Sequence, residues 1–77
     1  MAISRKKALK LLHGYAPRVE EHVQKIANDP ASRDVPHWLH EAKSWISQME
    51  DVLPHVGRKT AGEWQRRIAK WQASLGN

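Results

Sequence analysis

Apolar residues recur at alternating gaps of three and four residues in three separate stretches of this chain, and no other feature limits its fold as strongly. At about 100° per residue, this spacing places the apolar side chains along one continuous stripe of an α-helix. Three amphipathic helices in 77 residues predict an all-α fold, an up-down-up three-helix bundle formed as one helical domain over residues 1–77. The stripes are Leu9, Leu12, Ala16, Val19, Val23 and Ile26, then Val35, Trp38, Ala42, Trp45, Met49, Val52 and Val56, then Trp64, Ile68, Trp71 and Leu75.

The composition limits how such a bundle can be held together. Cysteine is absent, so neither a disulfide nor a thiolate metal site reinforces the core of so short a chain. Four Trp supply the bulk in the absence of Phe, since each Trp side chain buries roughly 150–250 Å². No apolar run approaches the roughly 20 residues that a membrane span needs. We therefore expect a cytoplasmic protein without a membrane partner, supported by its Trp residues or by a second copy in a homo-oligomer.

The first stripe predicts a helix from about Ser4 to Ala27, with Ser4 as its N-cap. Gly14 and Pro17 interrupt the pattern, so the helix is either kinked or broken near Gly14-Pro17. We favour a kinked helix because Pro17 falls on the side away from the stripe, where water can satisfy the carbonyl that loses its partner. The stripe also keeps its phase across this point. Asn28 suits a left-handed position after the helix.

Capping signals set the bounds of the other two helices. Asp34 is the expected N-cap of the second helix, with Pro36 in its first turn. This helix has the widest apolar face, which predicts that it is the central one. Pro54 should end it, and Gly57 is the expected C-terminal punctuation. The segment Thr60–Glu63 matches the capping box, in which the Thr hydroxyl and the Glu carboxylate satisfy each other's backbone donors, so the third helix is expected to start there.

The net charge of +5 is unevenly distributed along the chain. Residues 1–14 carry +4, residues 15–56 carry −3 and residues 57–77 carry +4, so basic ends enclose an acidic middle. Helix starts favour acidic residues because the backbone dipole leaves about half a positive charge there. Here basic residues load the first turn of the first helix and immediately precede the third. In an up-down-up bundle these two starts share one end, and the sequence therefore predicts an anion-attracting pole.

Nine basic residues form the nucleic-acid or anion-binding set that this pattern predicts. They would contact phosphates, and nucleic acid is the first polyanion to consider, with an acidic protein as the other partner. Three of them, Lys59, Arg66 and Lys70, fall on one exposed face of the last helix. The alternative is that all of these charges are simply solvated surface. The set is Arg5, Lys6, Lys7, Lys10, Arg58, Lys59, Arg66, Arg67 and Lys70.

The residues that carry chemistry are few. His37 and His40 could chelate zinc with Glu41 nearby, but their order matches neither zinc-protease motif, and the phase of the helix puts both imidazoles on the solvent side. The other three histidines add no ligand spacing. The pairs Glu20-Glu21 and Glu50-Asp51 diverge by about 100° on their helices, so neither converges on one bond. With no cysteine, Gly-flanked serine or phosphate loop, we expect no enzyme, no metal and no cofactor.

Two more specific modes of nucleic-acid binding are weaker. If the second helix reaches Val56, the link Gly57–Thr60 has the length of the turn in a helix-turn-helix. The long preceding helix and Pro54 argue against it, so binding directed at the backbone is better supported than reading of the bases. The four Trp could stack on single-stranded bases, but all of them lie within the stripes and are expected in the core or at a subunit interface.

The sequence supports two functional hypotheses. The first is a small non-enzymatic protein that binds nucleic acid or another polyanion through clustered Arg and Lys at its helix starts. The alternative is a protein-protein interaction module, or a self-associating adaptor, with a Trp-lined helical face too wide for its own core. Tyr15 lies at the edge of the first stripe, and its environment is left open.

Overall fold

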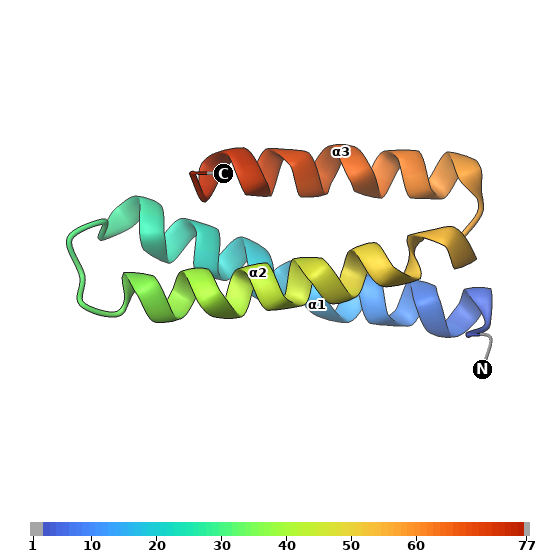
Figure 1. Cartoon of the computed structure of the whole chain (residues 1–77), viewed down its shortest axis with the longest axis horizontal. Coiled ribbons are helices and arrows are strands. Elements are labelled where there is room, and N and C mark those ends of the chain that lie inside the picture. The colour runs from blue at the N-terminus through green and yellow to red at the C-terminus, as the bar shows by residue number, and fades with distance from the viewer. Residues whose placement is uncertain (1–2, 77) are drawn as a thin grey trace.

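Three helices run up, down and up in a computed structural model that describes residues 3–76 (Figure 1). Helix α1 spans Arg5–Asn28, α2 spans Val35–Val52 and α3 spans Arg58–Ser74. A short 3-10 helix, η1, spans Leu53–His55 between α2 and α3. The expected all-α three-helix bundle is confirmed, and it is elongated, with principal extents of 40 × 21 × 17 Å.

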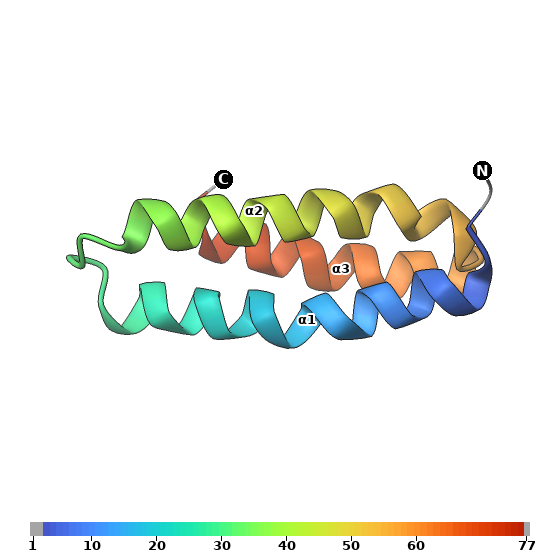
Figure 2. The same ribbon diagram turned by 90° about the horizontal axis from the view of Figure 1, so that it is seen from below.

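The three helices are not packed equally. Helices α1 and α2 form the closest pair, and α3 packs lengthwise alongside both (Figures 1 and 2). Helix α2 contacts both of the others, as expected of a central helix, but α1 and α3 do so as well. The wide apolar face predicted for the second helix is divided between two elements. Leu53 belongs to η1 and is buried, whereas Leu39 belongs to α2 and is half-buried.

The core follows the three stripes closely. Its largest fully buried side chains come from α1, from α2 and from the residue that follows η1, and they are Leu12, Val19, Ile46, Met49 and Val56. Trp64 and Trp71, only 5% and 7% exposed, close the core from α3. Trp38 and Trp45 of α2 are half-buried. The sequence therefore places α3's two Trp correctly, whereas α2 keeps part of its aromatic surface exposed.

Helix α1 is continuous through Gly14 and Pro17, as expected, and its ribbon bends in its second half (Figure 1). Pro17 is exposed, so water can reach the carbonyl whose hydrogen bond the proline removes. The Ser4 hydroxyl accepts a hydrogen bond of 3.1 Å from the Lys7 backbone N–H, which confirms the N-cap. The left-handed position expected for Asn28 was wrong: Asn28 is the last helical residue, and no non-glycine residue among 3–76 has positive φ.

The starts of α2 and α3 differ from their sequence signals. Asp34 occupies the N-cap position, but its helical backbone, with φ −82° and ψ −7°, keeps its side chain from capping. The capping box at Thr60–Glu63 was also wrong, because α3 begins two residues earlier, at Arg58. Gly57, at φ 86°, lets the chain turn from η1 directly into α3, and a residue with a Cβ would be strained there. Thr60 consequently lies inside the first turn of α3.

The starts of α1 and α3 predict different responses to the same kind of substitution. Ser4→Ala should lower the free energy of unfolding by about 1 kcal/mol, because it removes the acceptor of the Lys7 N–H. Thr60→Ala should leave the free energy of unfolding unchanged, or raise it by roughly a few tenths of 1 kcal/mol, because alanine is the better helix former. Urea denaturation followed by circular dichroism measures both. A larger loss at Thr60 than at Ser4 would contradict the observed start of α3.

Candidate nucleic-acid interface

The two basic helix starts lie at the same end of the molecule. Helices α1 and α3 run in one direction and α2 returns in the other, so both N-termini lie where α2 and η1 finish (Figures 1 and 2). Five exposed cations occupy the first turns of these two helices. They form what we call the cationic pole: Arg5, Lys6 and Lys7 from α1, and Arg58 and Lys59 from α3.

The electrostatics of the cationic pole are one-sided. Neither first turn contains an acidic residue, so the side-chain charges add to the partial positive charge of the unpaired backbone N–H groups. Glu50 and Asp51 approach this end along α2 and are exposed. Within residues 3–76, however, neither carboxylate forms an ion pair with a pole residue. An anion at this end would therefore meet positive groups that are not paired with any described carboxylate.

Arg67 differs from the rest of the predicted set because its charge is already engaged. Its guanidinium lies 3.1 Å from a carboxylate oxygen of Glu20 on α1. It also lies 4.4 Å from the ring centroid of Trp64 and 5.3 Å from that of Trp71. The ion pair with Glu20 ties α3 to α1, whereas the two ring contacts lie within α3 and hold the guanidinium in place. Arg67 stays a predicted member of the anion-binding set, but its guanidinium is already engaged within the fold.

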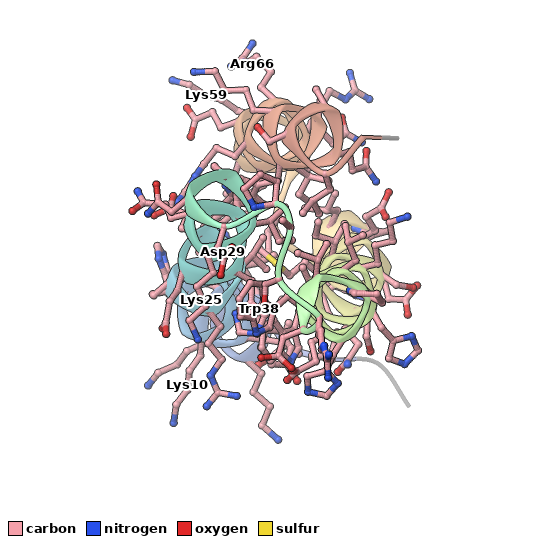
Figure 3. All side chains as sticks on the ribbon, turned by 90° about the vertical axis from the view of Figure 1, so that its left-hand side faces the viewer. Lys10, Lys25, Asp29, Trp38, Lys59 and Arg66 are labelled. Carbon is pink, nitrogen blue, oxygen red and sulfur yellow. The ribbon has the colours of Figure 1, made fainter. Side chains whose placement is uncertain are left out.

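The remaining basic residues split between two sides of the molecule. Lys59 and Arg66 project outward from α3, whereas Lys10 projects from α1 on the side away from α3 (Figure 3). Lys70 is exposed on the same outer face of α3 as Arg66, in a shallow open depression that Ala69 also lines. Lys59, Arg66 and Lys70 thus continue the cationic pole along α3. Lys10 is not brought together with them.

The helix-turn-helix interpretation does not fit the structure. In that motif the two helices cross at about 90–120°. Here α2 and α3 lie side by side and antiparallel, because η1 and Gly57 reverse the chain between them (Figures 1 and 2). The start of α3 therefore cannot enter a groove while α2 crosses the backbone. Helix α3 can still contact phosphates, but it cannot dock on DNA in the way that a helix-turn-helix does.

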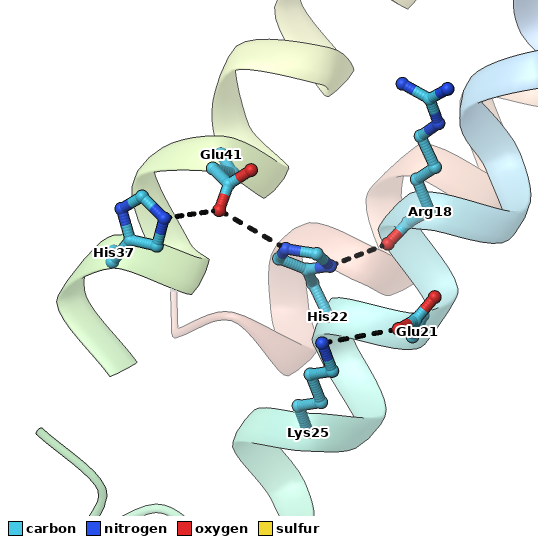
Figure 4. A network of polar contacts seen from close by, with 6 residues as sticks. All are labelled: Arg18, Glu21, His22, Lys25, His37 and Glu41. Atoms are coloured by element: carbon cyan, nitrogen blue, oxygen red, sulfur yellow. Dashed lines mark hydrogen bonds and ion pairs between the residues drawn. The ribbon is translucent and has the colours of Figure 1, made fainter. Parts of the chain in front are cut away.

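Sequence analysis missed one polar network, which joins α1 to α2 (Figure 4). The buried His22 Nδ1 lies 3.0 Å from the Arg18 carbonyl oxygen, so this nitrogen carries the proton. Its Nε2 faces the Glu41 carboxylate at 3.6 Å, and His37 Nε2 approaches the same oxygen at 2.7 Å. The available signal was the position of His22, three residues after Val19 at the edge of the first stripe.

This network is not arranged as a metal site. No group of three or more His, Cys, Asp or Glu within residues 3–76 is placed to hold a metal ion. His37 and His40 are exposed, as the phase of the helix predicted. The Glu41 carboxylate instead links two imidazoles, one from each helix, and thereby fixes the α1–α2 pair.

Comparisons of the chain with protein-family models, with curated proteins and with solved structures found no match. Among the described helices, none combines the length and the apolar character needed to cross a bilayer. The geometry and charge of the surface are therefore the basis on which a function can be proposed.

Proposed function

We propose that this chain is a small non-enzymatic protein that binds nucleic acid, or another polyanion, through the cationic pole. The observation that supports this function is the position of five cations, drawn from two distant segments, at one end of the bundle and without ion pairs to any described residue. Their placement opposes the helix dipoles and costs stability, which a purely structural surface would have no reason to retain. The cysteine-free composition favours a cytoplasmic location as part of this proposal.

Binding of this kind is directed at the phosphate backbone. Phosphates would approach the free N–H groups at the starts of α1 and α3, while Arg66 and Lys70 extend the contact along the outer face of α3. No pair of side chains in the set is arranged to read base edges. The affinity should therefore depend strongly on salt and little on sequence.

A titration of fluorescent single-stranded and duplex oligonucleotides across a salt series tests the proposal. About five phosphate contacts predict that the logarithm of the duplex association constant falls with the logarithm of salt at a slope of roughly −4 to −5. Fluorescence anisotropy measures the affinity at each salt concentration. No binding at low salt, or an affinity indifferent to salt, would exclude this function.

Two neighbouring arginines provide a matched pair for the same titration. Arg66→Gln should weaken binding about threefold and make the salt slope shallower by about one unit, because Arg66 is exposed and forms no ion pair within residues 3–76. Arg67→Gln should leave the slope unchanged and instead destabilise the fold, because Arg67 is held by Glu20 and two Trp rings. Equal losses of affinity in the two variants would show that the net charge, not its position, drives binding.

The second candidate is an interaction module or self-associating adaptor. The half-buried Trp38 and Trp45 of α2 favour it, because a chain with a small core leaves aromatic area unused there. Both functions can coexist, since these Trp lie along α2 and not in the first turns that form the cationic pole. Sedimentation velocity tests self-association directly, and a strictly monomeric protein would leave only the adaptor form of this candidate.

A further inference from the structure

Helix α3 covers the α1–α2 pair on one side only. It contacts α1 through Glu20 and through the ring of His13, which packs edge-on against Trp64 at 5.3 Å. Tyr15 and His22 contact α2 instead, and Tyr15 is displaced by about 140–160° around α1 from Glu20 and His13. The side of the α1–α2 interface that faces away from α3 therefore has no described element over it, and Trp38 is seen there between α1 and α2 (Figure 3).

Half-buried apolar side chains line this uncovered side, which we call the open seam. Leu11 and Tyr15 of α1 and Trp45 of α2 pack against the core from outside and remain partly exposed. Trp38 is also half-buried. Leu11 and Tyr15 lie about one turn apart on α1, and Trp38 and Trp45 lie about two turns apart on the antiparallel α2, where Trp45 stacks on Tyr15. A further helix is the element that such a surface accommodates, as in a four-helix bundle.

The rings of the open seam are already engaged with one another. Tyr15 and Trp45 are nearly parallel, with centroids 6.3 Å apart, and His22 meets Trp45 edge-on at 4.8 Å. Lys25 Nζ lies 5.8 Å from the centroid of the Trp38 ring. Nucleic-acid bases need free ring faces on which to stack. In the open seam Tyr15 is stacked on the Trp45 ring and Lys25 lies over the Trp38 ring, so the partly exposed strip better suits the apolar side chains of a protein helix.

The charge beside the open seam selects an acidic partner. Lys7, Arg18 and Lys25 recur along one side of α1, because their separations of 11 and 7 residues are close to three and two helical turns. Lys7 and Arg18 form no ion pair with the described residues. On the α2 side, the Glu41 carboxylate is occupied by His22 and His37. A second copy of this chain, with its net charge of +5, would meet repulsion at such an edge.

We propose that the open seam binds an acidic amphipathic helix of a partner protein, which docks as the fourth helix of the bundle. The proposal rests on the second candidate function and names its partner. From Leu11 to Lys25 the seam is about 21 Å long, enough for about four helical turns. Apolar residues of the partner at spacings of three and four contact Leu11, Tyr15, Trp38 and Trp45. Carboxylates along its flank meet Lys7 and Arg18, because Lys25 is already paired with Glu21 at 3.3 Å.

A synthetic amphipathic helix of about four turns, with leucines on one face and glutamates flanking them, is the probe. Nuclear magnetic resonance of the intact chain follows the four Trp indole N–H signals. We expect Trp38 and Trp45 to shift on titration and the buried Trp64 and Trp71 to stay in place. The double variant Lys7→Glu, Arg18→Glu should weaken binding about tenfold. The matched control Arg66→Glu, Lys70→Glu, on the outer face of α3, should not.

Each other outcome counts against the proposal. Equal binding of a probe with lysines in place of the glutamates would exclude an acidic helix as the partner. Shifts confined to α3 would overturn the open seam while leaving an interaction module in place, and no binding at all would remove both. Self-association through Trp38 and Trp45 would make a second copy the occupant. Oligonucleotide-induced shifts of the same two signals would make nucleic acid the occupant.

Discussion

Replacing Leu12 with alanine is expected to lower the free energy of unfolding by about 2–5 kcal/mol, which is a large part of the stability of so small a bundle. Leu12 is fully buried on α1, in the core that also contains Val19, Ile46 and Met49. Truncation removes apolar area from the core and leaves a cavity that three packed helices cannot fully close. Urea denaturation followed by circular dichroism measures the loss, provided that the variant still folds at low temperature.

The neighbouring leucine is the matched control. Leu11→Ala removes the same atoms from the same turn of α1, but Leu11 is half-buried at the open seam. The loss of unfolding free energy in Leu11→Ala should be well below that in Leu12→Ala, because much of the Leu11 side chain is already in contact with water. Equal costs at the two positions would mean that the open seam is covered in solution. Measuring both variants with and without the glutamate probe would then separate self-association from the partner helix.

The helices were predictable from the sequence because their apolar stripes are long and keep their phase. The stripe from Leu9 to Ile26 identified α1 in spite of Pro17. Helix starts were harder, because several capping signals compete within a few residues. The capping box at Thr60 does not start α3, because the positive φ of Gly57 lets the helix begin as soon as the chain leaves η1. Such a choice depends on where η1 packs, and the local sequence does not carry that information.

The candidate site was predictable in part for the same reason. The up-down-up order alone places the two basic helix starts at one end, and the structure bears out that geometry. The engagement of Arg67 was not predictable, because its partner Glu20 lies 47 residues away. The pairing of His22 with Glu41 likewise depends on how α1 and α2 are aligned. Pairings across helices follow from packing, whereas charge at a helix start follows from sequence.

Reversing the charge of the cationic pole should stabilise the protein and abolish its binding to nucleic acid. In the variant with glutamate at Arg5, Lys6, Arg58 and Lys59, each first turn gains the acidic residues that its dipole favours. The melting temperature should rise by roughly 5–10 °C at low salt, since each 1 kcal/mol is worth about 4–8 °C in a domain of this size. The affinity for duplex DNA should fall at least about a hundredfold.

The opposite signs of these two effects distinguish a binding surface from an ordinary one. A control with glutamate at Arg18, Lys25, Arg33 and Lys43 has the same net charge but leaves both helix starts unchanged. It should not be stabilised, and it should keep most of its affinity for DNA. If instead both variants lose DNA binding equally, long-range net charge accounts for the interaction and the cationic pole has no special role. If the pole variant is not stabilised, the cost that these cations impose on the helix dipoles is negligible, and the main reason to regard their position as functional disappears.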